Sequence, residues 1–346
     1  MRKWYRNTWF ARMNTAMFNA ILVTILMATG FTAGPVQSAE PIQMGIMTGG
    51  PKGTYYQFGL NLQKLVNTDG IELRVDNSNG SVENVYSVYQ KPQTQLGIVQ
   101  SDVLAFVSQV QTNPLLKRIA QKTKMVFPLY NEEIHLVGKK EINDFDYLAD
   151  KKVAIGKEGS GTYLTAKLLF KVAGFEPAEM ITIGTDEALT QLKEGAIDAM
   201  FYVAGYPVKL FSENVTPEDN LALIPILNKS VLEFYPQVEI PGGTYTWQEQ
   251  AVITAAVKAV LISYDFRRYH CDTVGRVSKL IYENFDWLKA NGHPKWKSVD
   301  LNYPLKGWEQ YDCVKKYLAG ARRKPSRPAS GTINPVLDAI KEMMPE

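Results

Sequence analysis

The sequence predicts an α/β protein built of two lobes joined by a hinge. Short apolar segments alternate with segments of helical periodicity, a pattern typical of α/β architecture. The same order of strand, glycine-containing turn and helix occurs twice along the chain. Two long apolar stretches follow the two repeats, and each is suited to cross between lobes.

The first repeat has expected strands at 42–47, 71–75 and 96–99. A turn ending in Gly53-Thr54-Tyr55 follows the first strand, and a helix with apolar residues three and four apart follows the turn. Ser81 is expected to cap the next helix. The third strand ends at Gln100-Ser101-Asp102.

The second repeat has expected strands at 153–156, 181–183 and 198–204. Its first turn, Gly159-Ser160-Gly161-Thr162, occupies the place that Gly53-Thr54-Tyr55 has in the first repeat. The expected crossings are 125–138, interrupted at Asn131-Glu132-Glu133, and 251–264. Gly242-Gly243-Thr244-Tyr245 has no clear strand before it and is interpreted as hinge or lid.

These crossings divide the chain into expected domains. Lobe one comprises 40–135 and 250–346, and lobe two comprises 136–249. Residues 1–39 are expected to be a cleaved secretory signal, because a basic start is followed by a short apolar core and then by Ser38-Ala39. An uncleaved anchor is the alternative, but the apolar core is short for a membrane span. The sequence therefore predicts a protein exported to the periplasm.

The two cysteines, Cys271 and Cys313, are expected to form a disulfide in such an oxidising compartment. A bond closing a loop of this length would stabilise the fold by ~3–4 kcal/mol. The alternative is a pair of buried thiols that pack as small apolar side chains.

Composition and motifs argue against several classes of function. The four basic residues in 1–39 change the formal net charge from +3 to −1 when removed, so the mature chain lacks the basic face of a nucleic-acid-binding protein. His135, His270 and His293 are too far apart for metal-ligand spacing. No nucleophile elbow or Walker loop is present. We therefore expect a protein that is not an enzyme and has no cofactor.

Ligands of open α/β sheets bind at the carboxyl ends of the strands. The glycine turns at these ends would expose backbone amides at helix starts, and such amides bind anions with the help of the helix dipole. Two of these turns facing each other could hold a carboxylate without arginine. The alternative is that each turn is only a tight turn with a helix cap.

Six motifs, in order along the chain, resemble the TAXI receptors, the TRAP-associated extracytoplasmic immunogenic proteins. They are Thr48-Gly49-Gly50 with Gly53-Thr54-Tyr55-Tyr56, Gly80-Ser81-Val82-Glu83-Asn84, Gly97-Ile98-Val99-Gln100-Ser101-Asp102, Gly159-Ser160-Gly161-Thr162, Asp198-Ala199-Met200-Phe201-Tyr202 with Gly205-Tyr206-Pro207, and Gly243-Thr244-Tyr245. The resemblance covers nearly the whole mature chain. Pro51 and Lys52 depart from the family's pattern and affect the expected ligand rather than the fold.

The resemblance implies a type II periplasmic-binding-protein fold and delivery of a small carboxylate, such as glutamate or a related C5 dicarboxylate or amino acid, to the membrane subunits of a TRAP permease. A monomer is expected. Transferred by motif, the ligand-binding candidates are Thr54, Tyr55, Ser81, Asn84, Gln100 and Asp102 in lobe one, with Ser160, Gly161, Thr162 and Tyr202 in lobe two. A periplasmic sensor that presents its ligand to a signalling protein, and a hydrolase on the same scaffold, remain alternatives.

Overall fold

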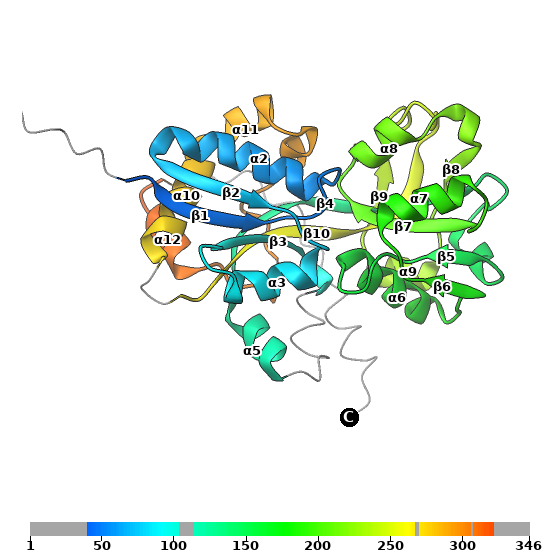
Figure 1. Cartoon of the computed structure of the whole chain (residues 1–346), viewed down its shortest axis with the longest axis horizontal. Helices are drawn as coiled ribbons and strands as arrows, with labels where there is room; N and C mark the ends of the chain where they lie inside the picture. Colours follow the sequence, from blue (N-terminus) through cyan, green and yellow to red (C-terminus); the bar gives the residue numbers. More distant parts are fainter. Residues whose placement is uncertain (1–39, 104–113, 267–269, 306, 322–346) are drawn as a thin grey trace, which may run out of the picture. The chain divides into compact units, whose positions relative to one another are not determined.

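The computed structural model of the chain describes residues 40–103, 114–266, 270–305 and 307–321. The predicted signal at 1–39 lies outside these residues. The described chain alternates between strands and helices, as the periodicity predicts, and Figure 1 shows their arrangement.

The strands, in chain order, are β1 (Ile42–Met47), β2 (Ile71–Asp76), β3 (Leu96–Gln100), β4 (Thr123–Lys139), β5 (Lys152–Ala154), β6 (Glu179–Ile181), β7 (Ala199–Ala204), β8 (Leu221–Leu223), β9 (Gln237–Ile240) and β10 (Val252–Tyr264).

The α-helices are α2 (Thr54–Val66), α3 (Ser81–Gln90), α5 (Pro114–Lys122), α6 (Gly161–Ala173), α7 (Thr185–Lys193), α8 (Lys209–Asn214), α9 (Lys229–Phe234), α10 (Cys271–Glu283), α11 (Phe285–Asn291) and α12 (Asp312–Leu318). Short 3₁₀ segments lie at Asn67–Asp69, Phe145–Leu148, Pro217–Asp219 and Pro294–Ser298.

One sheet connects the two repeats. Its strand order is β2-β1-β3-β10-β4-β7-β5-β6, with β8 beside β4 and β9 beside β10. Within each repeat the first strand lies between the other two and is parallel to both. In each repeat the first connection runs along the sheet in one direction and the second runs back in the other. Because parallel crossovers are right-handed, the helices of these two connections lie on opposite faces of the sheet. Figure 1 shows α2 and α3 on opposite sides of β1–β3.

The two long strands β4 and β10 join the repeats, as the predicted crossings require. They pair with each other antiparallel over Thr123–Glu133 of β4. Beyond this stretch β4 pairs with β7, whereas β10 pairs with β3 near one end and with β9 near the other. Each long strand therefore belongs to both halves of the sheet.

The helices form because one face of each is apolar at helical spacing. In α2, Tyr55, Phe58, Leu62 and Leu65 are buried. The side chain of Ser160 caps α6 by accepting a hydrogen bond from the Tyr163 amide at 3.1 Å. Ser81 does not cap α3, so that prediction is wrong: Gly80 occupies the N-cap position, and Ser81 is the first residue of the helix.

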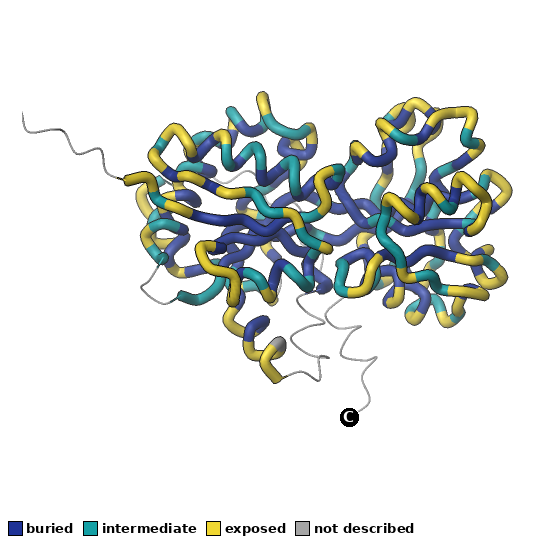
Figure 2. Tube along the Cα trace, in the orientation of Figure 1, coloured by how far each residue is buried: buried dark blue, intermediate teal, exposed yellow. Residues whose placement is uncertain are grey.

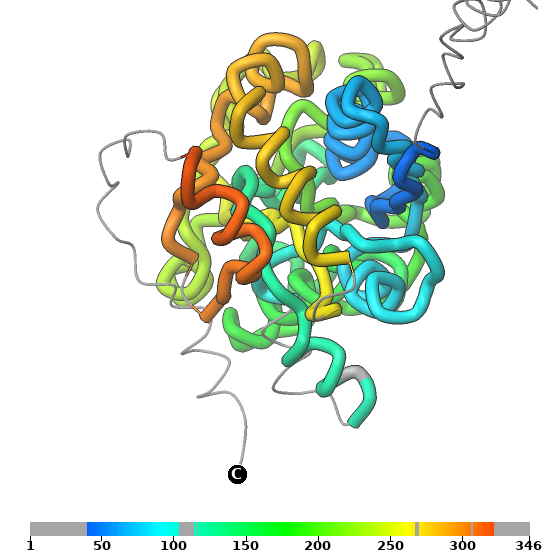
Figure 3. Tube along the Cα trace, turned by 90° about the vertical axis from the view of Figure 1, so that its left-hand side faces the viewer, coloured from blue at the N-terminus to red at the C-terminus, as the bar shows by residue number. Residues whose placement is uncertain are grey.

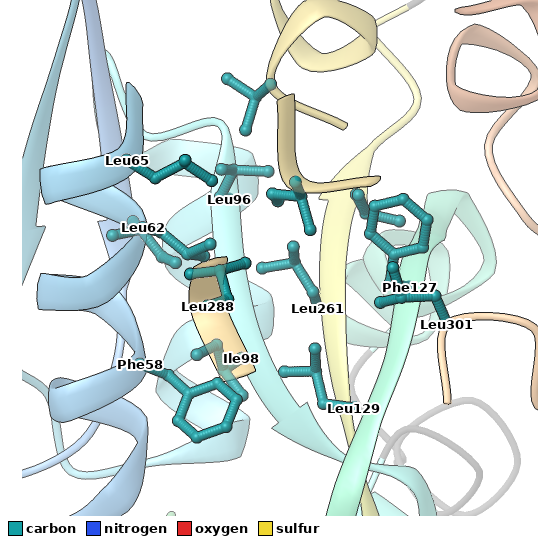
Figure 4. Packing of buried hydrophobic residues seen from close by; sticks show 14 of the residues in the cluster. Phe58, Leu62, Leu65, Leu96, Ile98, Phe127, Leu129, Leu261, Leu288 and Leu301 are labelled. Carbon is teal, nitrogen blue, oxygen red and sulfur yellow. The ribbon is translucent and has the colours of Figure 1, made fainter. Parts of the chain in front are cut away.

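Separate hydrophobic clusters fill the two halves of the sheet. One contains apolar side chains of α2, β3, β4 and β10; Figure 4 shows Phe58 and Leu62 facing Ile98, with Leu129 and Leu261 beyond. Another, around β5 and β7, includes Phe145, Phe170 and Phe201. Figure 2 shows that the strands are buried and that exposed residues lie mainly on outer helices and turns.

The C-terminal helices complete the half that contains β1–β3. In Figure 3, α10 and α12 (yellow to red-orange) lie on the same side of the molecule as α2 (blue), and α10 and α2 are in contact. Cys271 at the start of α10 and Cys313 in α12 form a disulfide, which confirms the predicted pairing. The interpretation of Gly242–Tyr245 as lid missed β9, a short strand that precedes it and pairs with β10.

Candidate functional site

A cavity of about 400 Å³ lies where the carboxyl ends of the parallel strands meet. Its lining residues come from the turns that follow β1, β2, β5 and β6, from the ends of β3 and β7, and from Glu132 on β4. Both repeats therefore contribute to the wall. This is the location that open α/β sheets use for ligands.

Four helices begin at the cavity: α2, α3, α6 and α7. The first amides of a helix have no intrahelical acceptor, and the dipole adds partial positive charge there. In the described chain, the N-caps of α2, α3 and α7 are Gly53, Gly80 and Gly184, which have no side chain to accept from these amides. The cavity wall is therefore rich in backbone donors.

The starts of α2 and α6 suit an anion best. Neither has an acidic residue in its first turn, whereas α3 has Glu83 and α7 has Asp186 and Glu187. Since α2 belongs to the first repeat and α6 to the second, one favourable helix start comes from each half. Both of the turns on which the sequence-based expectation of a carboxylate site rests therefore line the cavity, and anion binding by them stays a prediction.

Glycines allow the turns of the two halves to approach closely. Gly80 has φ +123°, and a Cβ there would lie 3.4 Å from the amide nitrogen of Gly161. A Cβ on Gly53 would lie 2.8 Å from the hydroxyl of Tyr202. A larger residue at position 53 would therefore require the Tyr202 hydroxyl to move, and at position 80 the positive φ disfavours residues other than glycine.

Most of the candidates named from sequence lie together in the cavity lining. These are Thr54, Tyr55, Ser81, Gln100, Ser160, Gly161, Thr162 and Tyr202. Asn84 and Asp102 do not line it. The structure thus brings the predicted segments to one place, and their contact with a ligand stays a prediction.

Asn84 and Asp102 instead hold other parts of the chain. The Asn84 amide donates to the carbonyl oxygens of Thr48 and Ile98, at 2.6 and 2.7 Å, and so joins the ends of β1 and β3. Asp102 accepts from the Thr165 hydroxyl at 2.8 Å and from the Tyr235 hydroxyl at 3.4 Å. Burial raises the pKa of Asp102 to about 6, despite these hydrogen bonds.

The candidate hydroxyl groups hold the backbone of the site. Thr54 donates to the Gly205 carbonyl at 2.5 Å, across the two repeats. Ser81 accepts from the Gln100 amide, and Thr162 accepts from the Val203 amide, each at 3.1 Å. The Thr54 proton is used within the protein, whereas Ser81 and Thr162 are acceptors in these bonds.

The most buried carboxyl group of the cavity is Glu132, which sequence reasoning did not select. It is 1% exposed and accepts a hydrogen bond from Tyr55 at 2.5 Å. Burial raises its pKa well above the usual range, because the charged form loses hydration. The signal available in the sequence was the interruption of the apolar crossing at Asn131-Glu132-Glu133.

The neighbouring residue Glu133 has a different environment. Its carboxylate lies 2.6 Å from the ammonium nitrogen of Lys295, and both side chains are almost fully buried. The amide of Tyr206 also donates to Glu133, at 3.3 Å, and the Lys295 ammonium lies 3.6 Å from the centroid of the Tyr206 ring. This pair joins β4 to the C-terminal region and to the turn after β7.

The rim of the cavity carries exposed charges. Lys52 pairs with Asp186 across the two repeats at 2.5 Å, and Lys157 is an exposed cation of the lining. No arginine belongs to the lining among the described residues. A bound anion would therefore depend mainly on backbone amides.

The buried histidine of β4, His135, lies outside the cavity lining. It lies in the part of β4 that pairs with β7, and its ring nitrogen is 2.9 Å from the Tyr245 hydroxyl. Burial lowers the pKa of His135 to about 3. It is therefore neutral at ordinary pH. Over residues 40–103, 114–266, 270–305 and 307–321, no group of His, Cys, Asp and Glu side chains has the arrangement of a metal site.

The family model of the NMT1-like family matches residues 46–307, which is well over half of the chain. The chain belongs to the NMT1-like family. The matched region includes all the strands from β2 to β10 and every segment that lines the cavity.

This NMT1-like protein is similar in fold to a solved structure described as a periplasmic transporter. The sequence identity is 14%, the TM-score is 0.52, and the match covers 82% of this chain and 94% of the other. A Bordetella bronchiseptica protein matches with 16% identity and a TM-score of 0.48, over 81% of each chain. The L-arginine-bound substrate-binding protein AbpA of Streptococcus pneumoniae matches with 15% identity and a TM-score of 0.44, over 81% of this chain and 96% of AbpA.

The NMT1-like chain therefore has the mixed α/β fold of periplasmic solute-binding proteins, type II-like, as predicted. In the described part of the chain, no helix combines the length and apolar character that a membrane crossing needs.

Proposed function

We propose that this chain is an exported solute receptor of the TAXI type. It binds a small carboxylate, namely glutamate or a related C5 dicarboxylate or amino acid, and delivers it to a TRAP permease. Membership of the NMT1-like family and the solute-binding fold support a receptor. The six sequence motifs support the TAXI type. In this proposal residues 1–39 are removed on export, and β4 and β10 form the hinge between lobes.

The observation that carries the proposal is the convergence of helix starts on one cavity. The starts of α2 and α6, one from each repeat, present backbone amides and no acidic side chain in the first turn. Together these amides supply the partial positive charge that a carboxylate needs. Exposed Lys157 adds a cation at the rim.

The size of the cavity also suits a small molecule. Its volume of about 400 Å³ falls near the lower end of the range for ligand sites in proteins. A large peptide or a nucleic acid would not fit within it. A five-carbon acid would, with its carboxylate directed to the helix starts.

The first experiment identifies the ligand. Native mass spectrometry of freshly purified protein would report what co-purifies, and a thermal-shift panel of organic acids, amino acids and sugars would report what stabilises the fold. A ligand at 100 times its Kd should add ~2.7 kcal/mol to the free energy of unfolding. If only sugars raise the melting temperature, the carboxylate proposal is wrong.

A glycine substitution tests the wall itself. A Cβ on Gly161 would overlap the side-chain oxygen of Gln100 and lie 3.0 Å from the Ser81 hydroxyl. We expect Gly161→Val to fold and to bind the ligand at least tenfold more weakly in titration calorimetry. Gly320→Val is the control, since a Cβ there meets nothing within 4 Å. Wild-type affinity of a folded Gly161→Val protein would contradict a ligand at this helix start.

Delivery to a permease needs a cellular test. Uptake of the labelled ligand should be lost when either this gene or the genes of the TRAP permease that it serves are deleted. The ligand recovered from the protein should be chemically unchanged, which would argue against a hydrolase. Normal uptake without this protein, together with a lost transcriptional response to the ligand, would favour a sensor.

A further inference from the structure

The floor of the cavity differs in chemistry from its wall. Glu132 lies there, 1% exposed, with the Tyr55 hydroxyl 2.5 Å from one carboxyl oxygen. The side-chain amide of Gln100 also lies near this carboxyl group and acts to lower its pKa. Both partners of Glu132 are neutral, whereas the next residue, Glu133, has the buried cation of Lys295. Glu132 is therefore a buried acid at a ligand cavity, and no described cation forms an ion pair with it, although the charge of Glu132 acts on Lys295 from a distance.

A second acceptor lies beside Glu132. The side-chain oxygen of Gln100 is buried and has no hydrogen-bond partner among the described residues, although Gln100 is only 2% exposed. It lines the same cavity and lies against Gly161 at the start of α6. A buried amide oxygen without a partner loses the hydrogen bond that water would give it, so its position favours a ligand that supplies a donor.

The cavity thus has donors on its wall and acceptors on its floor. A ligand that carries only carboxylates would satisfy the amides of α2 and α6, but it would offer no donor to the unpartnered oxygen of Gln100. A ligand that also carries a protonated amine would satisfy both regions. Three N–H groups of an ammonium could reach Glu132 and Gln100 together.

We propose that Glu132 and Gln100 form a subsite for the ammonium group of the ligand, so that the receptor selects small amino acids over plain dicarboxylates. This inference rests on the proposed function, which supplies the carboxylate end of the ligand. Tyr55 keeps the Glu132 carboxyl group in place through its hydroxyl.

The subsite implies a change of protonation on binding. Burial raises the pKa of Glu132, so the empty site favours the neutral acid. When an ammonium arrives, the carboxyl group releases its proton to the solvent and becomes the carboxylate of an ion pair. The ligand keeps its own proton, so one proton is released for each amino acid bound.

The experiment compares ligands that differ only in the amine. Titration calorimetry at pH 7 would use L-glutamate against glutarate, and L-norvaline against pentanoate. We expect each amine-bearing member to bind at least tenfold more tightly to the wild-type protein. The released proton is taken up by the buffer. The heats measured in phosphate and in Tris should therefore differ by the difference between the ionisation enthalpies of the two buffers, multiplied by the number of protons released.

Two variants locate the effect. Glu132→Gln keeps the shape and the acceptor for Tyr55 but cannot form the ion pair, so the preference for the amine should fall to about onefold and proton release should disappear. Glu158→Gln makes the same change at an exposed residue outside the lining and should preserve both. Unfolding curves confirm that each variant is folded.

The outcomes separate this inference from the proposed function. Equal or tighter binding of glutarate and pentanoate by the wild-type protein would overturn the ammonium subsite and leave a carboxylate receptor. A preference for the amine that survives in Glu132→Gln would also overturn it. Failure of every carboxylate to bind would overturn the proposed ligand class, and the subsite with it.

Discussion

Glu132 and Glu133 are adjacent on β4, yet their carboxyl groups have different partners: a cation for Glu133 and neutral groups for Glu132. Successive side chains of a strand point to opposite faces. Glu133 points toward Lys295, 2.6 Å away, and Glu132 points into the cavity, where Tyr55 and Gln100 are its neutral partners. Both are almost completely buried.

The difference separates a structural acid from one that is available to a ligand. A buried charge costs free energy unless a partner compensates it. For Glu133 the partner belongs to the protein, and the pair connects three distant segments. Burial raises the pKa of both carboxyl groups, and Lys295 partly offsets this for Glu133. Glu132 has no ion pair of this kind among the described residues, so its charged form would be stabilised by a cation that reaches it. Three predictions test this comparison.

The largest effect is expected from Glu133→Gln. This change leaves the ammonium of Lys295 buried without its counter-charge, and breaking such a pair typically costs 3–5 kcal/mol, so we expect a loss of about that size in urea unfolding. The double variant Glu133→Gln/Lys295→Met should recover much of the loss, because it removes the stranded charge. An unchanged unfolding midpoint for Glu133→Gln would mean that the pair is not structural.

A smaller effect is expected at Asp102, a buried acid outside the cavity that, like Glu132, has hydroxyl partners. Its pKa of about 6 in the fold exceeds the value of about 3.9 in an unfolded chain. The folded state therefore holds the proton more tightly, and the stabilisation is complete below pH ~4 and is lost as pH rises through about 6. The loss should approach ~3 kcal/mol.

Asp102→Asn should remove this pH dependence. Unfolding measured from pH 4 to pH 7 should show a smaller fall in stability for the variant than for the wild-type protein. If the free energy of unfolding rises over this interval by a similar amount in the wild-type protein and in Asp102→Asn, the assigned direction of the Asp102 pKa shift is wrong.

The smallest effect on stability is expected from Glu132→Gln. The amide oxygen still accepts from Tyr55, and no charge is stranded, so the free energy of unfolding at pH 7 should be unchanged or higher, by about 1 kcal/mol at most. Urea unfolding beside Glu133→Gln gives the direct comparison. A loss as large as that of Glu133→Gln would show that Glu132, too, serves mainly to hold the fold.

The fold was predictable from local patterns. Most strand and helix positions followed from the spacing of apolar residues, although the strand expected at 181–183 lies at Glu179–Ile181. The repeated Gly-Thr-Tyr turns placed α2 and α6 correctly. β9 was missed because Gln237–Ile240 is short and pairs with a strand that follows it. The cap at Ser81 was misplaced because Gly80 adopts a positive φ that only glycine takes readily, and this shifted the helix start.

The site was predictable in its segments and less so in its chemistry. Motif positions brought Gln100 and Gly161 to the cavity, but Asn84 and Asp102 follow strand ends too and turn away to bind the protein itself. Glu132 was not predicted as a cavity residue, because its surroundings come from several distant segments that meet only in the fold. Nothing in the order Glu132-Glu133 reveals which of the two has Lys295.

The course of β4 and β10 has a consequence for the order in which the molecule assembles. The cluster around β5 and β7 draws all its buried residues from one continuous stretch, 134–257. The cluster around β1–β3 needs 44–130 and also 259–314, which are separated by that whole stretch. Contacts distant in sequence form late because closing the intervening chain costs entropy. During synthesis the half formed by 134–257 can therefore fold as soon as its own residues are made. The core around β1–β3 can be completed only after residues 259–314 have been added.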